Sequence, residues 1–330
     1  MKTKAAASPR ENRNTAYVAK AKAKRAIISI VRGLLLFGLC FMIIEPMLTR
    51  LGVSLMEERD LYDSTIVLLP RHVTLDNFKI VFTLTTFPKS MINTLWTSLL
   101  VSVLQVIACT LVGYGFARYD FPLKKFWFGC VVALIIIPPQ TISTSLYTYF
   151  ARFDFLGIVK LFNHGEPINL RGSVLPYTLM SATCMGLKNG LYIYMLRQYF
   201  RGIPKSLEEA AYVDGCGTMH TFVRIMLPDA MPTVLSCFLF SFVWQWTDLF
   251  YTRNFLATSA RPIFSTELST IVPRMSRYFS GNGTPVIVPV GRQQQLISIG
   301  VLICCIPLVI LYIFTQRTFV QSIAMSGSKE

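Results

Sequence analysis

The polar segment 204–232 carries the most patterned side chains of this sequence. Ser206 precedes Glu209 by three residues, which is the spacing of a capping box at the start of a helix. Gly215 follows where a left-handed residue can end that helix, and Thr218 can begin a second one. We therefore predict two short helices joined at a glycine. Such a hairpin could dock a partner protein, or it could lie as an amphipathic helix on a membrane surface.

Residues that would indicate catalysis, nucleotide binding or metal binding are missing from the sequence. It contains no P-loop motif for a nucleotide phosphate, so any ATP hydrolysis must come from a partner. The three histidines are scattered, and seven of the eight cysteines lie in apolar runs, where cysteine acts as a small apolar residue. We expect no catalytic residue, no metal site and no cofactor bound by this chain. The net charge of +15 lies in tails and loops rather than along one polar face, which argues against nucleic-acid binding.

Long uncharged runs dominate the chain, of which 53% is hydrophobic and only 15% charged. A helix needs about 20 apolar residues to cross a bilayer, and several runs are long enough. The sequence therefore predicts an all-α polytopic membrane protein. Pro138 and Pro139 must break or kink the third span, because proline lacks an amide hydrogen and clashes with the preceding turn. The six expected spans are 26–48, 90–117, 126–147, 174–196, 230–251 and 296–315.

The basic N-terminal tail, residues 1–25, sets the expected orientation. A cluster of lysines and arginines before the first apolar run normally stays on the cytoplasmic side. No small-residue cleavage site follows that run, so we expect an uncleaved first span rather than a signal peptide. An even number of spans returns the C-terminus to the cytoplasm. Segment 201–228 then faces the cytoplasm, and loop 252–295 faces outward.

Lys188 interrupts the fourth predicted span and is a candidate for a substrate path. A lysine near mid-bilayer costs about 2.5–3.5 kcal/mol on insertion scales, so it needs a wet cavity, a partner or a route to the headgroups. It could line a pathway or snorkel to the cytoplasmic surface. Gly186 and Gly190 flank it at a spacing that permits close helix approach, which also fits a subunit interface.

Three further path candidates, Gln245, Trp246 and Asp248, lie near the outer end of the fifth span. Aromatic residues at this depth can belong to the interfacial belt. Alternatively, an aromatic face can stack on a sugar ring while amide and carboxylate oxygens accept hydrogen bonds from its hydroxyls. Both readings remain open at this point.

The spacing of Glu209-Ala210-Ala211, Gly215, Ile225 and Leu227-Pro228 resembles the EAA signature of ABC importer permeases. In that family the EAA helix inserts into a cleft on the cytoplasmic ATPase, and the glycine allows the bend. The resemblance implies that Glu208 and Glu209 face basic groups of the ATPase and that Ala210 and Ala211 permit close approach. The implied docking residues are Glu208, Glu209, Ala210, Ala211, Asp214, Gly215, Ile225, Leu227 and Pro228.

Four other segments resemble permeases of the binding-protein-dependent carbohydrate type, related to the smaller permease of the maltose transporter. They are Leu196–Phe200, Trp244–Asp248, Pro138-Pro139 and Thr74–Phe78; one departure is Thr247, where many relatives have asparagine. The resemblance implies a type I ABC importer permease fold over residues 26–330, in a bacterial cytoplasmic membrane. It also implies a second homologous permease, two ATPase subunits that bind ATP and Mg, and an extracytoplasmic binding protein that delivers a sugar or oligosaccharide.

The outer loop 252–295 mixes prolines with the run Ser280-Gly281-Asn282-Gly283. A loop of this length could be a solvated connector. In maltose-type relatives the corresponding loop reaches into the cleft of the binding protein, so the resemblance implies that part of 274–284 makes this contact. The candidate contact residues are Arg274, Arg277, Tyr278 and Phe279.

A proton- or sodium-coupled secondary carrier is the main alternative, and a non-transporting membrane scaffold is a second one. Secondary carriers typically need ionisable groups near mid-membrane and inverted repeats. The membrane carboxylates Glu45 and Asp248 lie toward span ends, and no internal repeat is visible. A scaffold gives no reason for the EAA-like hairpin. The sequence therefore favours an importer permease.

Overall fold

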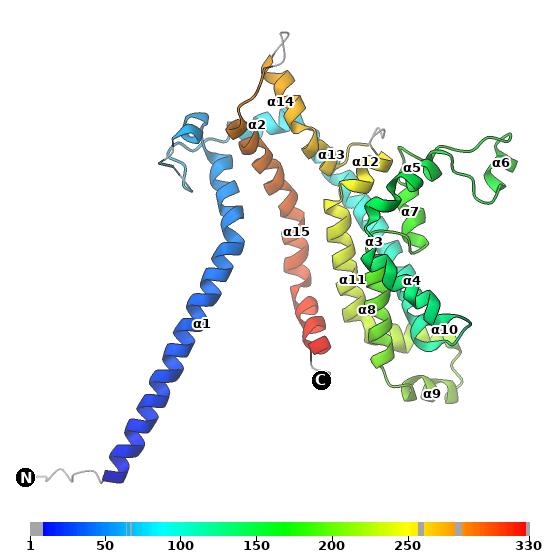
Figure 1. The fold of residues 1–330 in the computed structure, drawn as a ribbon, viewed down its shortest axis with the longest axis horizontal. Helices are drawn as coiled ribbons and strands as arrows, with labels where there is room; N and C mark the ends of the chain where they lie inside the picture. The colour runs from blue at the N-terminus through cyan, green and yellow to red at the C-terminus, as the bar shows by residue number, and fades with distance from the viewer. Residues whose placement is uncertain (1–8, 64, 67, 257–260, 281–285, 328–330) are drawn as a thin grey trace, which may run out of the picture. The chain divides into compact units, whose positions relative to one another are not determined.

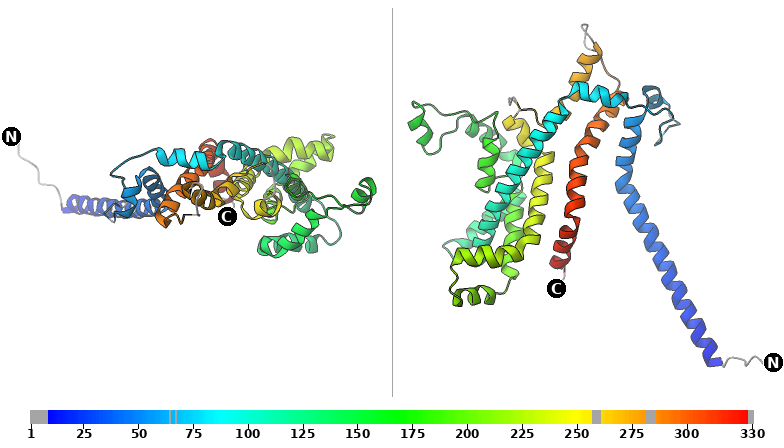
Figure 2. Two further views of the ribbon diagram at one scale, coloured as in Figure 1. Left: turned by 90° about the horizontal axis from the view of Figure 1, so that it is seen from above. Right: turned by 180° about the vertical axis from the view of Figure 1, so that it is seen from behind.

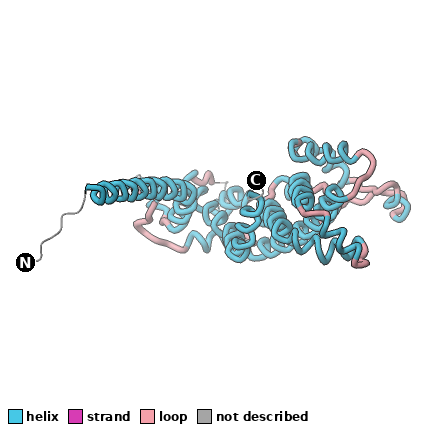
Figure 3. Tube along the Cα trace, turned by 90° about the horizontal axis from the view of Figure 1, so that it is seen from below, coloured by secondary structure: helices cyan, strands magenta, loops and turns pink. Residues whose placement is uncertain are grey.

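Helices make up most of the described chain, as Figure 3 shows. The computed structural model describes residues 9–63, 65–66, 68–256, 261–280 and 286–327. Within these ranges there is no strand, only two isolated bridges, so the predicted all-α fold is confirmed. The chain divides into a first unit, 1–78 with 290–302, and a second unit, 79–289 with 303–330.

The first unit is built on the long helix α1 (Pro9–Leu55), with η1 (Glu58–Tyr62) and the start of α2 (Asp76–Leu84). The apolar side chains of α1 between 27 and 48 are exposed, which suits a helix surrounded by lipid. Residues 290–302, the first turns of α15 (Val290–Gly327), complete the unit. Asn77 and Gln295 both donate to the Met56 carbonyl, at 2.8 and 2.6 Å, and thereby hold the segments together beyond the end of α1.

The second unit has a bundle of α3 (Phe87–Arg118), α8 (Asn189–Gly202) and α11 (Leu227–Thr247), which run side by side in Figures 1 and 2. Two glycines allow the closest approaches. A Cβ at Gly113 of α3 would lie 2.9 Å from the Leu196 Cβ of α8. A Cβ at Gly190 of α8 would lie 2.7 Å from the Val131 carbonyl oxygen of α4 (Lys124–Ile136). The close helix approach predicted at Gly190 therefore occurs within this chain.

The third predicted span is broken, as the two prolines require. Helix α4 ends at Ile136, a short turn η2 (Pro139–Ile142) follows, and α5 is Ser143–Ala151. The two halves meet at 101°. Pro138 is extended (φ −66°, ψ 136°) and cannot continue the helix, which confirms the predicted break.

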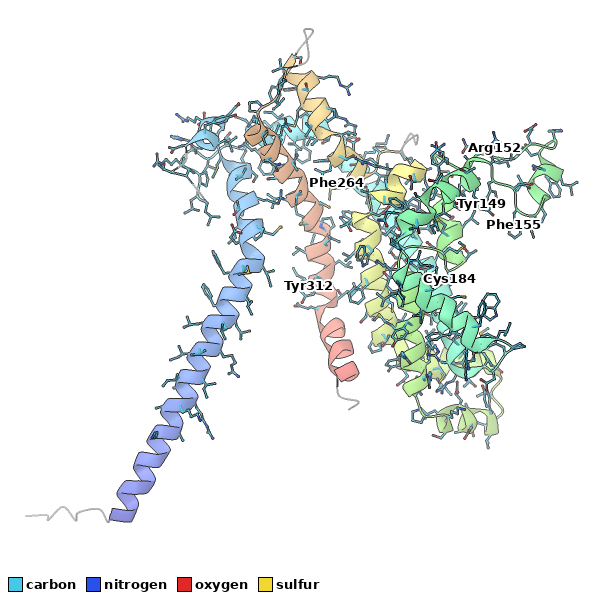
Figure 4. The ribbon with its side chains drawn as sticks, viewed as in Figure 1. Tyr149, Arg152, Phe155, Cys184, Phe264 and Tyr312 are labelled. Carbon is cyan, nitrogen blue, oxygen red and sulfur yellow. The ribbon has the colours of Figure 1, made fainter. Side chains whose placement is uncertain are left out.

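The continuous helix predicted over 174–196 is wrong. The structure has α7 (Leu175–Ala182) and α8, separated by the link 183–188. Cys184 and Lys188 have left-handed φ values of 59° and 61°, whereas a right-handed helix needs φ near −63°. Figure 4 places Cys184 between the two ends of the bundle. Apolar composition did not predict this interruption, and among the described residues neither α7 nor α8 is long and apolar enough to cross a membrane by itself.

Short helices gather at the end of the second unit that lies away from Arg118. They are α5, α6 (Ile158–Phe162), α12 (Phe250–Leu256), α13 (Phe264–Ser269) and α14 (Ile271–Ser280). Figure 4 shows Tyr149 and Phe264 at this end. Among the described residues, helices at 20–55, 87–118, 218–247 and 290–316 are long and apolar enough to cross a membrane, and the bent pair α4–α5 can form a fifth span.

Candidate functional site

The predicted hairpin forms at the Arg118 end of the second unit. Helix α9 (Ser206–Val213) is followed by Gly215 at φ +80°, the left-handed conformation that favours glycine. Helix α10 (Thr218–Thr221) then leads into a π-helical turn η3 (Phe222–Met226) and directly into α11. We call residues 206–226 the docking hairpin. The first helix and the left-handed glycine after it agree with the prediction.

Two local details of the hairpin differ from the prediction. The capping box is not formed, because the backbone of Lys205 is already helical and its carbonyl accepts from the amides of Glu208 and Glu209. Ser206 therefore lies inside the helix rather than at its cap. The second helix is also not a separate element, since 218–247 forms one helical run. The π-helical turn just before Pro228 lets the chain pass this proline without ending the helix.

Glu208 points into the protein, contrary to the expectation that it faces a partner. Its carboxylate pairs with the Arg118 guanidinium, with Nε and Oε2 3.0 Å apart, and both side chains are less than 10% exposed. The Tyr114 hydroxyl donates to the other carboxylate oxygen at 2.8 Å. Arg118 also donates to the Ile203 carbonyl at 2.9 Å. Glu208 is thus bound by groups of this chain, and sequence analysis missed both Tyr114 and Arg118.

The outer face of the docking hairpin combines a carboxylate with exposed apolar side chains. Val213 is 87% exposed, Met219 68% and Leu207 47%, while Glu209 is exposed beside them. Exposed apolar groups rimmed by polar ones are typical of protein interfaces. Of the other predicted docking residues, Ala210, Asp214, Gly215 and Pro228 are exposed, Ile225 and Leu227 are half-buried, and Ala211 is buried.

A cavity of about 650 Å³ lies where the broken third span meets the link before α8 and the end of α11. Its walls are residues 134–140, Leu187, Lys188, Trp244 and 247–250. The Lys188 ammonium lies 5.0 Å from the centre of the Trp244 ring, within cation–π range. Lys188 therefore reaches an aromatic wall of a cavity at a helix break, rather than interrupting a continuous helix.

Two of the predicted path candidates, Gln245 and Trp246, do not line this cavity. Trp246 is only 1% exposed, and its indole N–H donates to the Cys304 carbonyl at 3.2 Å. Gln245 is buried. Trp244 and Thr247 line the cavity instead, because residues three and four apart share one face of a helix. Trp244 lies four residues before Asp248, so helical periodicity in the sequence could have identified it as a residue on the same face as Asp248.

Asp248 lines the cavity, but its carboxylate is held by the fold. It accepts from the Thr252 amide at 2.9 Å and from the Tyr177 hydroxyl at 3.1 Å. The Tyr251 amide donates to its other oxygen at 3.3 Å. These bonds satisfy free amides at the start of α12, as an acidic residue before a helix commonly does. Asp248 therefore shapes the cavity wall by joining α11 to α12.

Gln105 is a polar residue of α3 that sequence analysis did not select. It is only 2% exposed, and its amide donates to the Leu187 carbonyl in the link before α8. It also bonds Asn189 and Ser241. A side-chain amide thus satisfies backbone freed by the helix break, which is necessary where no water is available.

Arg274, one of the predicted binding-protein contacts, is engaged within this chain. Its guanidinium binds both carboxylate oxygens of Glu267, at 2.7 and 2.8 Å, and donates to the Leu84 carbonyl at 3.1 Å. The Thr86 amide also donates to Glu267, at 3.0 Å. Burial raises the pKa of Glu267, but the bonds from Arg274 and Thr86 outweigh burial and hold that pKa below its usual range. This charged pair fixes α13 and α14 to the loop before α3.

The other three predicted contacts, Arg277, Tyr278 and Phe279, are exposed on α14. Tyr278 is 48% and Phe279 39% exposed, and their rings pack edge-on at 5.3 Å. Part of the predicted contact segment, 281–284, lies outside the described residues. These three side chains on α14 are therefore accessible to a partner.

Comparison with known proteins identifies the family to which this chain belongs. The family model described as "binding-protein-dependent transport system inner membrane component" matches residues 109–325, about two thirds of the chain. This chain belongs to that family. The match contains the docking hairpin, the cavity and α14, and family membership excludes the secondary carrier and the scaffold.

Individual relatives extend the similarity to nearly the whole permease. The arabinooligosaccharides transport system permease protein AraQ of Halalkalibacterium halodurans is 26% identical over 93% of this chain and 99% of its own length. The trehalose transport system permease protein SugB of Mycobacterium tuberculosis is also 26% identical, over 93% of this chain and 99% of its own. A solved bacterial ABC transporter that imports alginate contains a chain with TM-score 0.64 and 16% identity, covering 90% of this chain and 98% of that one. The shared fold is that of an ABC importer permease.

Proposed function

We propose that this permease is one of two unlike membrane subunits of an ATP-driven importer for a sugar or oligosaccharide. A separate binding protein delivers the sugar outside the cell, and two ATPase subunits bind ATP and Mg on the cytoplasmic side. This chain has no catalytic role in that scheme. Both termini and the docking hairpin lie in the cytoplasm of a bacterium, and α12 to α14 lie outside.

The docking hairpin carries this proposal. An exposed carboxylate and large apolar side chains on a short helix, ended by a left-handed glycine, form a surface of the kind that inserts into a cleft of another protein. The proposal for a sugar rests on the names of the relatives, which include arabinooligosaccharide, trehalose and maltodextrin permeases. The cavity beside Trp244 is the corresponding candidate for the substrate path.

The first prediction concerns ATPase attachment. Glu209→Lys reverses the charge of an exposed carboxylate on the docking hairpin, so we expect the ATPase recovered with the tagged permease to fall by more than about tenfold. The membrane partner should remain, because no contact of the bundle is touched. Glu166→Lys, the same change at an exposed site near α6, is the matched control.

The composition of the purified complex tests the rest of the assembly. Wild-type protein from native membranes should carry one second permease and two ATPase subunits. If the Glu209→Lys variant retained ATPase and took up sugar as well as the wild-type protein does, the docking assignment would be contradicted. A functional importer with this chain as its single membrane component would contradict the heteromeric assembly.

The second prediction concerns the cavity. Trp244→Ala removes an aromatic wall, and one aromatic contact contributes about 0.5–1.5 kcal/mol beyond buried area, so we expect sugar uptake to weaken up to about tenfold. Uptake is measured with arabinooligosaccharides, trehalose and maltodextrins. Trp96→Ala is the control, because Trp96 is 62% exposed on α3 and does not line the cavity. Equal effects of the two substitutions would remove Trp244 from the path.

The third prediction concerns α14. If Tyr278 and Phe279 contact the binding protein, replacing both with alanine should lower binding-protein-stimulated ATP hydrolysis and sugar uptake. Basal hydrolysis and assembly should persist, since both rings lie on the surface. Tyr312→Ala, an exposed aromatic residue on α15, serves as the control. Unchanged stimulation in the double variant would make α14 only a connector.

A further inference from the structure

The docking hairpin is joined to the bundle by a buried charged pair. Glu208 of α9 and Arg118, the last residue of α3, are 9% and 6% exposed in their side chains and lie 3.0 Å apart. A positive charge at the C-terminal end of a helix is also favourable, because the last carbonyls carry partial negative charge. The pair therefore connects the partner-facing helix directly to a membrane-spanning helix 90 residues earlier in the chain.

Tyr114 makes the connection rigid. Its hydroxyl donates to Glu208 at 2.8 Å, and its ring packs on Phe200 of α8 and Phe222 of η3, with centroids 5.3 and 4.7 Å apart. All three rings are buried in one apolar cluster. One side chain of α3 thus contacts α8, α9 and the start of the α11 run at the same point.

Another ion pair at this end of the bundle has different surroundings. Lys124 and Asp120 are four residues apart and 3.0 Å apart in space, with the Asp120 side chain 98% exposed. This pair joins the link after α3 to the first residue of α4 and does not involve the docking hairpin. Exposed pairs of this kind contribute little to stability. Burial and the second donor distinguish Glu208 from an ordinary surface carboxylate.

The connection continues from α3 to the cavity. Gly113 of α3 lies against Leu196 of α8, and Lys188, the residue just before α8, lines the cavity. Gln105 of α3 holds the Leu187 carbonyl, which precedes that lysine. Because close-packed helices shift as bodies rather than deform, a displacement of α9 reaches the cavity wall through α3 and α8.

We infer that Glu208, Arg118 and Tyr114 form the joint that transmits ATPase movement to the cavity, and that they act on it as positioning residues. This inference rests on the proposed function, since the movement originates in a docked ATPase. Glu209 and the exposed hairpin side chains bind the ATPase, whereas Glu208 ties the hairpin to α3. Loss of the joint should leave the ATPase attached, but the accessibility of the cavity should no longer depend on the nucleotide bound to the ATPase.

The test follows the accessibility of the cavity in the assembled complex, reconstituted in liposomes. Thr247→Cys places a thiol on the cavity wall, and its labelling by a charged maleimide is quantified by mass spectrometry, with and without ATP and vanadate. We expect the labelling rate to change by about tenfold with nucleotide, within the range of allosteric couplings. In Glu208→Gln and Tyr114→Phe backgrounds the change should shrink to less than about twofold. Asp120→Asn, which removes the exposed pair, should retain the full change.

Attachment of the ATPase is measured on the same samples and separates the two proposals. An unattached ATPase in the parent complex overturns the proposed function and this inference together. If the ATPase stays attached and the labelling rate still changes fully with nucleotide in both Glu208→Gln and Tyr114→Phe, the inference alone is overturned. Should Glu208→Gln fail to assemble, Tyr114→Phe decides, because it keeps the buried ring and removes only the hydroxyl.

Discussion

A backbone inside a membrane must find its hydrogen-bond partners within the protein, and this constraint applies wherever the permease departs from regular helix. Two of the helix breaks among the described residues, at 137–138 and at 183–188, border the cavity. At the second break, the Gln105 side-chain amide donates a hydrogen bond to the Leu187 carbonyl. At the first, the Thr141 hydroxyl donates to the Pro138 carbonyl at 2.7 Å. At each break a side chain thus bonds one backbone carbonyl, and the cavity is lined by residues of both breaks.

The same helix bundle carries both the cavity and the anchor of the docking hairpin. Glycines at 113 and 190 bring α3, α8 and α4 into backbone contact, so the cavity wall and the hairpin anchor belong to one packed body. Asp248 and the Glu267–Arg274 pair fix the short helices at the opposite end. Charged groups of this unit therefore hold helix ends in place, and Lys188 contributes its charge to the cavity.

The sequence predicted the elements whose cause is local. The consecutive prolines Pro138 and Pro139 disfavour a continuous helix, and Gly215 favours a left-handed turn, so both features were visible in the residue types. The link before α8 was not visible in the sequence, because an apolar segment has the same composition whether it forms one continuous helix or two helices with a link between them. Trp244 and Trp246 differ by the face of α11 that they occupy, which adjacency in sequence conceals. Glu208 could not be assigned inward, since its partners Tyr114 and Arg118 come from another helix.

The central claim is that α9 and α3 move together. Pulsed spin-label spectroscopy on the assembled importer measures it most directly, with unnatural-amino-acid labels at Lys205, which precedes α9 and lies outside the docking hairpin, and at Trp96 of α3, both exposed. These labels leave the native cysteines in place. The account predicts the same mean distance in the nucleotide-free and ATP-bound states. A change of several ångströms between the two states, with Glu208 intact, would show that the docking hairpin moves independently of the bundle and would contradict the account.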